Sequence, residues 1–380
     1  MRLSKTRKLA GGATVGLILG GLLGLSGLAG CAANEEQPAG GGTGNSAGSA
    51  GAGLTGELNG AGASSQSAAQ EAWRGGFAAI EAGVNVNYDP VGSGDGRTQF
   101  TAGGLGFVGT DAPFKADEAK GGHGSCAADS PLVEVPVYIS PIAVAFNLDG
   151  VTELNLAPNV IAHIFTGGIT NWNDPAIKAD NPDVDLPDLP ISPVHRSDKS
   201  GTTGNFTDYL TATAPEAWTA GETEEWPESG GEGAEKTQGM VQALTAGKGS
   251  IGYVDAGQAQ DLSWASIKVG DQWVKPSAEG AAKAVAESEL ESGRGEGDVV
   301  YSLNRTTEAA GAYPLILVSY LAACEKYSDP KTAELVSAYL KYVVSEEGQK
   351  AAAENAGSAP LTSEADLTAK VNAAVARIGS

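Results

Sequence analysis

From Leu54 onward, short apolar stretches alternate with stretches of helical periodicity, and turns rich in glycine, serine or threonine separate them. Val84, Val86 and Tyr88 alternate with two asparagines, a pattern that predicts a half-buried strand. The preceding segment, 65–82, carries aromatic and aliphatic side chains at helical spacing and ends before a glycine. A chain that alternates strands and helices in this way is expected to form an α/β fold.

The same alternation continues toward the end of the chain. Further strands are expected at 105–108, 136–147, 191–194, 251–254 and 313–321, and further helices at 206–210 and 333–344. The long apolar strand at 136–147 is expected to cross between two lobes, and a chain of 380 residues supports two lobes of about 150 residues each. We place these lobes at 54–140 plus 305–380 and at 141–304.

The N-terminal residues have the pattern of an export signal. Basic residues precede an uncharged apolar run that ends in Leu28-Ala29-Gly30-Cys31. This arrangement resembles a lipoprotein signal over 1–30, after which Cys31 becomes the acylated N-terminus. The alternative is a transmembrane helix, because about twenty apolar residues can span a bilayer. Cleavage would leave 31–53, rich in glycine, alanine and serine, as a flexible tether that anchors the protein to the extracytoplasmic face of the cell membrane.

Two cysteines remain once Cys31 is acylated. Exported proteins fold in oxidising compartments, so Cys126 and Cys324 are expected to form one disulfide. The alternative is two separate buried thiols.

The net charge limits the partners of this chain. It is −22 for the whole chain, and the first thirty residues contribute four basic side chains and no acid. A protein this acidic is a poor partner for nucleic acid. It also repels small anions at long range, so any anion that binds must be held by local dipoles and donors.

Three turns combine glycine with hydroxyl side chains where a predicted helix begins: 60–65, 92–96 and 200–203. A helix N-terminus presents unpaired amide donors and a partial positive charge, which suits a dehydrated oxyanion. Glycine permits close approach of the backbone, and serine or threonine adds a donor. Taken singly, each turn is better explained by ordinary N-capping than by an anion site. Three together favour an anion site.

One arginine and one aspartate, Arg196 and Asp111, lie at similar strand ends and strengthen this interpretation. Arg196 can offer two parallel donors to an oxyanion, and Asp198 can orient it, although a surface ion pair is the alternative. Asp111 is more informative, because a carboxylate repels an anion unless that anion carries a proton to donate. Phosphate at neutral pH carries such a proton and sulfate does not. Asp111 therefore predicts a phosphate site that rejects sulfate.

Six segments resemble one known family in the same order along the chain. They read GAGASS (60–65), VNYDPVGSGDG (86–96), GFVGTDAPF (106–114), IFTGGITNWNDPAI (164–177), HRSDKSGTTGNFTDYL (195–210) and GSIGYVD (249–255). Together they resemble the phosphate-binding proteins of ABC-type phosphate importers. The resemblance runs from about residue 58 to 360 and implies a type II periplasmic-binding-protein fold, in which two α/β lobes hold dehydrated phosphate between them.

The resemblance also implies a role for each matching residue. The implied phosphate ligands are Ser64, Ser65 through its backbone amide, Ser93, Asp111 as the acceptor of the phosphate proton, Arg196, Ser200, Gly201 and Thr202. Asp198 would hold Arg196 in place. Two positions depart from the family: Ser65 stands where an aromatic residue is usual, and Lys199 stands where glycine is common. Lys199 is expected at the rim of the cleft or in solvent, and neither change removes a ligand.

The sequence gives little support for catalysis. The histidines at 123, 163 and 195 lack metal-ligand spacing, and no Walker A sequence is present. We therefore expect a monomeric binding protein without a metal or cofactor that delivers inorganic phosphate to membrane permease subunits. Two alternatives stay open: the same fold tuned to another oxyanion, such as sulfate or molybdate, and a surface lipoprotein that serves adhesion.

Overall fold

The computed structural model describes residues 53–361 and 365–379. The predicted signal over 1–30, the acylation site Cys31 and the tether up to residue 52 lie outside the described residues. Within the described ranges, no helix is both long enough and apolar enough to cross a membrane.

A nine-stranded mixed sheet organises the described chain, in the order β2-β1-β3-β14-β4-β8-β6-β7, with β9 added beside β4. Its strands are β1 (Thr55–Gly62), β2 (Gly83–Asp89), β3 (Phe107–Thr110), β4 (Leu132–Phe146), β6 (Ser192–Arg196), β7 (Glu232–Ala234), β8 (Ser250–Asp255), β9 (Ser263–Trp264) and β14 (Ile316–Cys324). Smaller sheets contain β5 (Asn155–Leu156), β10 (Ser266–Val269), β11 (Gln272–Val274), β12 (Glu289–Leu290) and β13 (Tyr301–Ser302).

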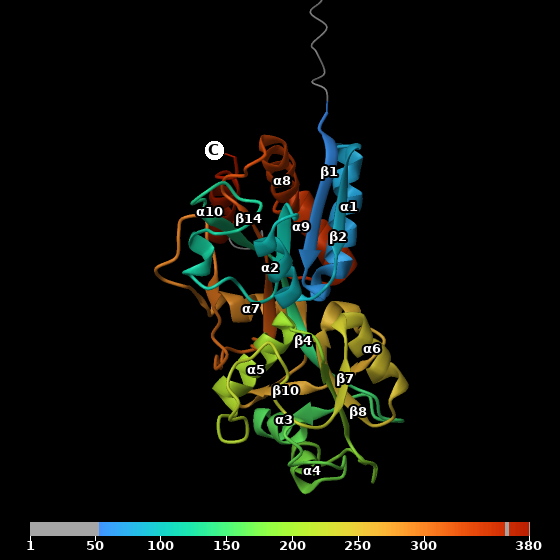
Figure 1. Ribbon diagram of the computed structural model, residues 1–380. Helices are drawn as coiled ribbons and strands as arrows, with labels where there is room; N and C mark the ends of the chain where they lie inside the picture. The colour runs from blue at the N-terminus through green and yellow to red at the C-terminus, as the bar shows by residue number, and fades with distance from the viewer. Residues whose placement is uncertain (1–52, 362–364, 380) are drawn as a thin grey trace, which may run out of the picture. The chain divides into compact units, whose positions relative to one another are not determined.

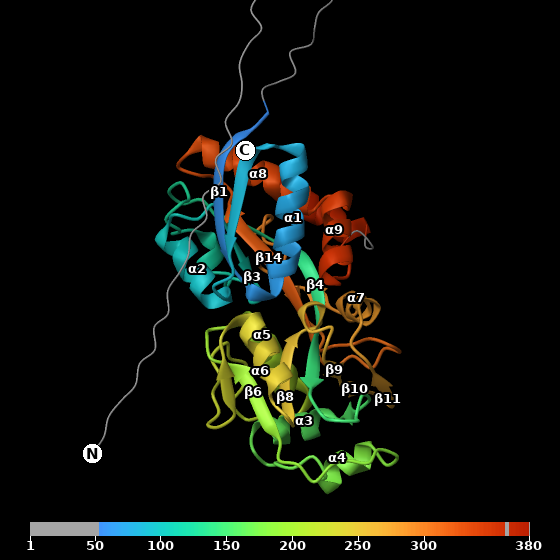
Figure 2. The same ribbon diagram turned by 90° about the vertical axis from the view of Figure 1, so that its right-hand side faces the viewer.

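The long strand β4 connects two halves of this sheet. Its segment 132–141 pairs with β14, and its segment 142–146 pairs with β8. Strands β1, β2, β3 and β14 therefore form what we call the upper part, and β6, β7, β8 and β9 form the lower part (Figure 1). Figure 2 shows β4 running from the upper part into the lower part.

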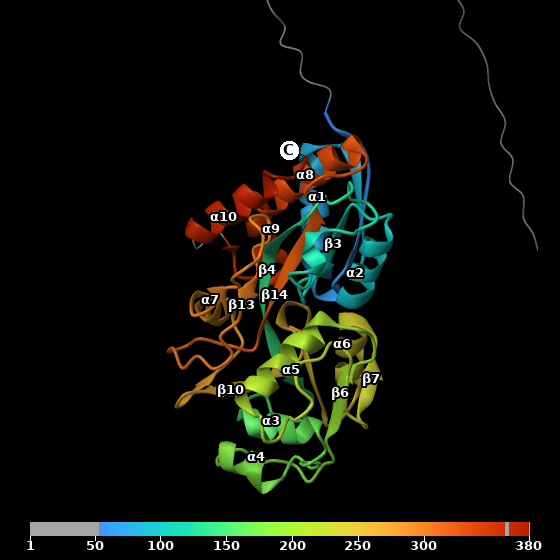
Figure 3. The ribbon, with the colours of Figure 1, turned by 60° about the vertical axis from the view of Figure 1, so that its left-hand side comes forward.

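Helices surround both parts of the sheet (Figure 3). Near the upper part lie α1 (Ser67–Ile80), α2 (Ser93–Ala102), α8 (Pro330–Val343), α9 (Glu346–Ala356) and α10 (Ala365–Val375). Near the lower part lie α3 (Pro158–Phe165), α4 (Pro175–Asp180), α5 (Gly201–Thr213) and α6 (Lys236–Ala246), while α7 (Ala278–Ala286) lies beside β4. Short 3₁₀ helices are η1 (Ser64–Gln66), η2 (Glu118–Lys120) and η3 (Ala256–Gln258). The predicted alternation of strands and helices is confirmed.

The central strands β4 and β14 are buried along their whole length, as a long apolar run predicts. The start of β4 was predicted wrongly, because the strand begins at Leu132 and not at Pro136. Proline cannot donate to a sheet ladder, but a register shift between Ser319 and Tyr320 in β14 falls opposite this proline. The irregularity lets the strand continue through Pro136.

A disulfide joins Cys126 to Cys324 at the end of β14, with Cα atoms 5.3 Å apart and a sequence separation of 198. It ties the segment that precedes β4 to the strand that follows the lower part. Both cysteines lie in the upper part.

The last residue of β8, Asp255, is fully buried between the upper and lower parts. Its carboxylate accepts hydrogen bonds from Tyr138 (3.1 Å), Ser140 and Gln258 (3.2 Å). Burial outweighs these donors and raises the pKa of Asp255 from 3.8 to about 7. Between these two pKa values the folded protein keeps a proton on Asp255 that the unfolded chain has released. The contribution of Asp255 to the free energy of unfolding therefore falls as pH rises from 3.8 to about 7.

Replacing Asp255 with asparagine is expected to remove this contribution to the pH dependence. One such carboxyl makes the free energy of unfolding fall by up to about 1.4 kcal/mol per pH unit. This slope should become flatter between pH 4 and 7 in the variant, as measured by chemical unfolding at several pH values. Asp149→Asn is the matched control, because the Asp149 side chain is exposed and pairs only at the surface with Lys248. An unchanged slope in the Asp255 variant would mean that this carboxyl titrates normally.

Candidate functional site

Three helices begin close together where strands of both parts end. The helix η1 follows β1, α2 follows β2, and α5 follows β6, and Asp111 comes directly after β3. Strands β1, β2 and β3 are parallel, so their carboxyl ends lie at one edge of the sheet. This is the edge at which open α/β sheets place their ligands.

Asp111 lies at the centre of this arrangement and is only 3% exposed. Its carboxylate accepts hydrogen bonds from the hydroxyls of Ser65 (2.7 and 2.8 Å), Thr202 (3.0 Å) and Ser319 (2.5 Å). Burial raises the pKa of Asp111, and these three hydroxyls and the charge of Arg196 oppose that rise. The donors come from η1 and β14 in the upper part and from α5 in the lower part.

Ser93 and Gly201 also contact Asp111. The Ser93 hydroxyl accepts a hydrogen bond from the Asp111 backbone amide at 3.1 Å. A Cβ atom at Gly201 would lie 2.7 Å from both the Asp111 Cβ and the Ser93 Oγ. Only glycine therefore allows the start of α5 to approach these two residues.

Arg196 ends β6 and is 3% exposed. Its Nε donates to Asp198 Oδ1 at 2.7 Å, and its Nη2 pairs with Asp198 Oδ2. Asp198 also accepts the backbone amide of Lys236 at the start of α6, at 3.0 Å. Partial burial raises the pKa of Asp198, but the bonds and charge of Arg196 outweigh it and hold that pKa below the ordinary value. A Cβ at Gly92, which precedes α2, would lie 2.7 Å from Asp198 Oδ2.

The remaining predicted residues have other contacts. Ser200 caps α5, where its hydroxyl accepts the Thr203 amide at 3.2 Å. Ser64 Oγ lies 3.0 Å from the hydroxyl of Thr237 and accepts the Thr237 amide at 3.1 Å. Ser64 of the upper part thus meets the start of α6 in the lower part, a contact that sequence reasoning missed.

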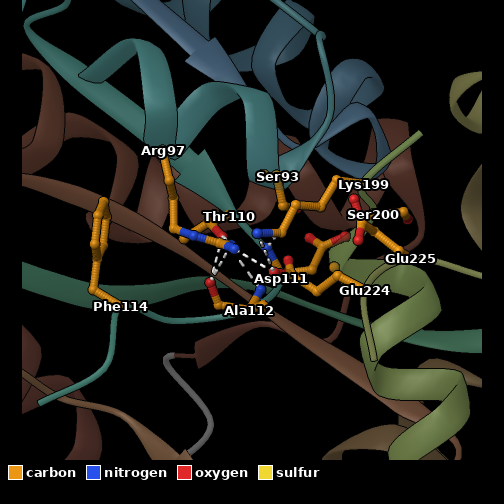
Figure 4. A network of polar contacts seen from close by, with 12 residues as sticks. Ser93, Arg97, Thr110, Asp111, Ala112, Phe114, Lys199, Ser200, Glu224 and Glu225 are labelled. Atoms are coloured by element: carbon orange, nitrogen blue, oxygen red, sulfur yellow. Dashed lines mark hydrogen bonds and ion pairs between the residues drawn. The ribbon is translucent and has the colours of Figure 1, made fainter. Parts of the chain in front are cut away.

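A charged network crosses between the two parts beside Asp111 (Figure 4). Arg97 of α2 donates to Thr110 Oγ1 at 2.7 Å and to the Ala112 carbonyl at 2.8 Å, and it pairs with Glu224 from the loop between α5 and β7. Lys199 Nζ lies 3.8 Å from the same Glu224 oxygen. The Glu224 carbonyl accepts the Ser200 amide at 2.9 Å, so this loop is attached to the start of α5.

Lys199 lies where the upper and lower parts meet. Its side chain is 48% exposed, and a Cβ at Gly94 would meet the Lys199 Cγ and Cδ at 2.4 Å. The Gly94 amide donates to the Lys199 carbonyl at 3.2 Å. The stem of Lys199 therefore covers the first turn of α2, and its ammonium group points toward Glu224 (Figure 4).

Two features of this site suggest its chemistry. The starts of η1, α2 and α5, together with Arg196, offer backbone, hydroxyl and guanidinium donors to an oxyanion. Asp111 adds an acceptor, which favours an oxyanion that carries a proton. Among the residues that the structure describes, no group of three or more His, Cys, Asp or Glu side chains could hold a metal ion.

Comparison with known proteins gives one consistent family. Residues 46–347 match the model of the PBP superfamily domain. The phosphate-binding protein PstS2 of Mycobacterium bovis is 34% identical over 371 residues, which cover 95% of this chain and 98% of that protein. PstS3 of the same organism is 35% identical over 372 residues, with the same coverage of both chains.

Solved structures give the fold. A high-affinity periplasmic phosphate-binding protein, solved with bound phosphate, matches with a TM-score of 0.65 at 22% identity, over 83% of this chain and 93% of that one. The expected type II periplasmic-binding-protein fold is confirmed. With near-complete coverage of relatives above 30% identity, this chain belongs to the PstS family of phosphate-binding proteins.

Proposed function

We propose that this protein captures inorganic phosphate outside the cytoplasm and passes it to an ABC-type phosphate importer, without performing chemistry on it. The observation that carries this proposal is the buried carboxylate of Asp111, which lies among three helix starts that otherwise suit an anion. A protonated phosphate can donate to Asp111 while the helix amides and Arg196 bind its other oxygens. The names of the relatives, which are phosphate-binding proteins, support this reading.

In this proposal, the ligands are Ser64, Ser65, Ser93, Asp111, Arg196, Ser200, Gly201 and Thr202. Asp198 orients Arg196 through their two hydrogen bonds. Ser65 would donate its backbone amide to phosphate, since its hydroxyl already binds Asp111.

Capture would proceed by closure of two lobes around dehydrated phosphate. We assign the first lobe to 54–140 plus 305–380 and the second to 141–304, with the junction in β4 near Ser140. The direct contacts between Asp111 and Thr202 and between Gly94 and Lys199 would form only when the lobes are closed. Phosphate that binds both lobes would favour this closed state, which the permease subunits would then recognise.

We also propose that the protein is a monomer anchored by lipid on Cys31 at the extracytoplasmic face of the membrane. Lipid attachment with two or three acyl chains would hold it stably. A Cys31→Ala variant is expected to move from the detergent phase to the aqueous phase in a partitioning assay. Unchanged membrane retention would favour a transmembrane helix over 9–28 instead.

The decisive test is calorimetric titration of the purified protein, stripped of bound ligand, with phosphate and then with sulfate at matched ionic strength. Tight one-to-one binding of phosphate without heat from sulfate would support the proposal. Binding of sulfate or molybdate in preference to phosphate would assign the fold to another oxyanion. An absence of heat with all three anions would favour the adhesion alternative.

The ion pair between Arg97 and Glu224 should stabilise the closed state, because it joins α2 of the first lobe to a loop of the second. Both side chains are largely buried, with 14% and 16% exposure. Replacing Glu224 with glutamine removes the charge, and we expect phosphate to dissociate about tenfold faster, as for the loss of one charged hydrogen bond. Stopped-flow fluorescence of the nearby Trp226 can measure this dissociation rate.

The adjacent Glu225 provides the control. Its side chain is exposed, and Glu225→Gln removes the same charge one residue away. If both variants accelerate dissociation equally, the effect comes from net charge and not from the contact with Arg97.

A further inference from the structure

A buried asparagine on α5 connects two residues that meet between the upper and lower parts. Asn205 is 8% exposed, and its Nδ2 donates to the backbone carbonyl of Asp111 and to that of Gly201, both at 2.9 Å. Asp111 follows β3 in the upper part, while Gly201 begins α5 in the lower part. One side-chain amide thus sets the spacing between Asp111 and the start of α5.

The orientation of this amide is fixed by a buried arginine. Arg305, which is 5% exposed, donates through Nη2 to Asn205 Oδ1 at 2.5 Å. An arginine offers only donors, so it selects the oxygen of Asn205, and the two carbonyls must face the nitrogen. The three partners therefore define one orientation of the side chain.

Arg305 is in turn held from two directions. Its Nε binds Asp208, one turn further along α5, at 2.7 Å. Its Nη1 donates to the carbonyls of Pro314 (3.1 Å) and Ile316 (2.7 Å), at the beginning of β14. The strand β14 also supplies Ser319, which binds the Asp111 carboxylate. Asn205 and Arg305 therefore connect α5, β14 and Asp111 in one buried network.

The space around this network would allow Asp111 to move if the network were broken. A cavity of about 260 Å³ adjoins it and is lined by Asp111, Asn205 and Arg305, together with other residues of α5 and β14. The amide of Asn205 thus holds Asp111 beside this partly open pocket. Loss of this buried donor also removes one hydrogen bond from each of the two carbonyls.

We propose that Asn205, held by Arg305, is a positioning residue that fixes Asp111 against the start of α5 and thereby sets the preference for a protonated oxyanion. This inference rests on the proposed phosphate-binding function. Asn205 acts through Asp111 and Gly201 and is not itself a ligand of the anion. A shift of Asp111 away from α5 would weaken the acceptor for the proton of phosphate and relieve the repulsion of sulfate.

The test compares Asn205→Ala and Asn205→Asp with the unmodified protein by calorimetric titration with phosphate and sulfate. We expect the alanine variant to bind phosphate about tenfold or more weakly and to lose about tenfold in selectivity over sulfate, since a buried hydrogen-bonded amide is removed. Asn205→Asp keeps an acceptor for Arg305 but places an oxygen against both carbonyls. Its added charge should weaken the binding of both anions. The displacement of Asp111 should also lower the ratio of phosphate affinity to sulfate affinity, so this variant is expected to lose selectivity as well.

Asn355→Ala is the matched control, because Asn355 is exposed on α9 and bonds only within its own helix. If the Asn205 variants melt at lower temperature but keep the selectivity of the unmodified protein, Asn205 is merely structural and the inference is overturned. If the alanine variant does not fold, the aspartate variant decides. Failure of the unmodified protein to bind phosphate would instead contradict the proposed function.

Discussion

Replacing Arg196 with alanine is expected to weaken phosphate binding by about tenfold to a hundredfold, which corresponds to the loss of a charged, buried hydrogen-bond partner worth about 1.5 to 3 kcal/mol. Arg196 is almost completely buried at the end of β6, where two hydrogen bonds to Asp198 fix the plane of its guanidinium group. The donors that remain on Nη1 and Nη2 can form parallel hydrogen bonds to an oxyanion, and truncation to alanine removes them. Calorimetric titration with phosphate measures the change.

Lys248→Ala is a suitable control for the loss of one positive charge. The Lys248 side chain is 78% exposed, so its removal changes the net charge without touching the site. Comparison of melting temperatures separates loss of binding from loss of folding, because Asp198 also loses its partner in the Arg196 variant. Retained phosphate affinity in a folded Arg196→Ala protein would place the anion elsewhere.

Replacing Asp111 with asparagine is expected to reduce the selectivity for phosphate over sulfate by a hundredfold or more. A site built to hydrogen-bond one particular group can discriminate against a ligand that lacks it by about 10⁴ to 10⁵. The carboxylate is an acceptor and repels an anion that has no proton. An asparagine can turn an N–H toward the anion, which serves sulfate as well as phosphate. Titration of the variant with each anion gives the ratio directly.

Asp95→Asn provides the comparison, since Asp95 is exposed in the first turn of α2 and has the same charge. The Asp111 variant should also lose some stability, because three hydroxyls donate to the carboxylate in the folded protein. Unchanged affinity and unchanged selectivity would together show that Asp111 does not contact the ligand.

The fold and much of the site could be predicted because the relevant signals are local. Alternation of Val84, Val86 and Tyr88 predicted β2, whose burial does alternate. Glycine and hydroxyl residues at helix starts likewise drew attention to Ser65, Ser93 and the segment 200–203. Such patterns depend on the backbone of a few neighbouring residues, so they are visible in the sequence itself.

The partners that reach the site from distant segments could not be predicted. Ser319 binds Asp111 across 208 positions of sequence, and Thr237 meets Ser64 across 173. A weak signal existed for Ser319, because it is the one serine in the buried apolar run of β14. For Glu224, in a loop without periodicity, no local pattern indicates the pairing with Arg97. These contacts arise only from how the two halves of the sheet meet.

The chain order of the central sheet has a consequence for how this protein is made. The lower strands β6, β7 and β8, with the end of β4, come from one continuous stretch of sequence and can assemble as soon as residue 255 is available. The upper strand β3 has to wait for β14, and until then its edge is unpaired and open to wrong partners. The upper part is therefore the late-folding part, and synthesis interrupted before residue 316 leaves the half that carries Asp111 unfinished and prone to aggregation.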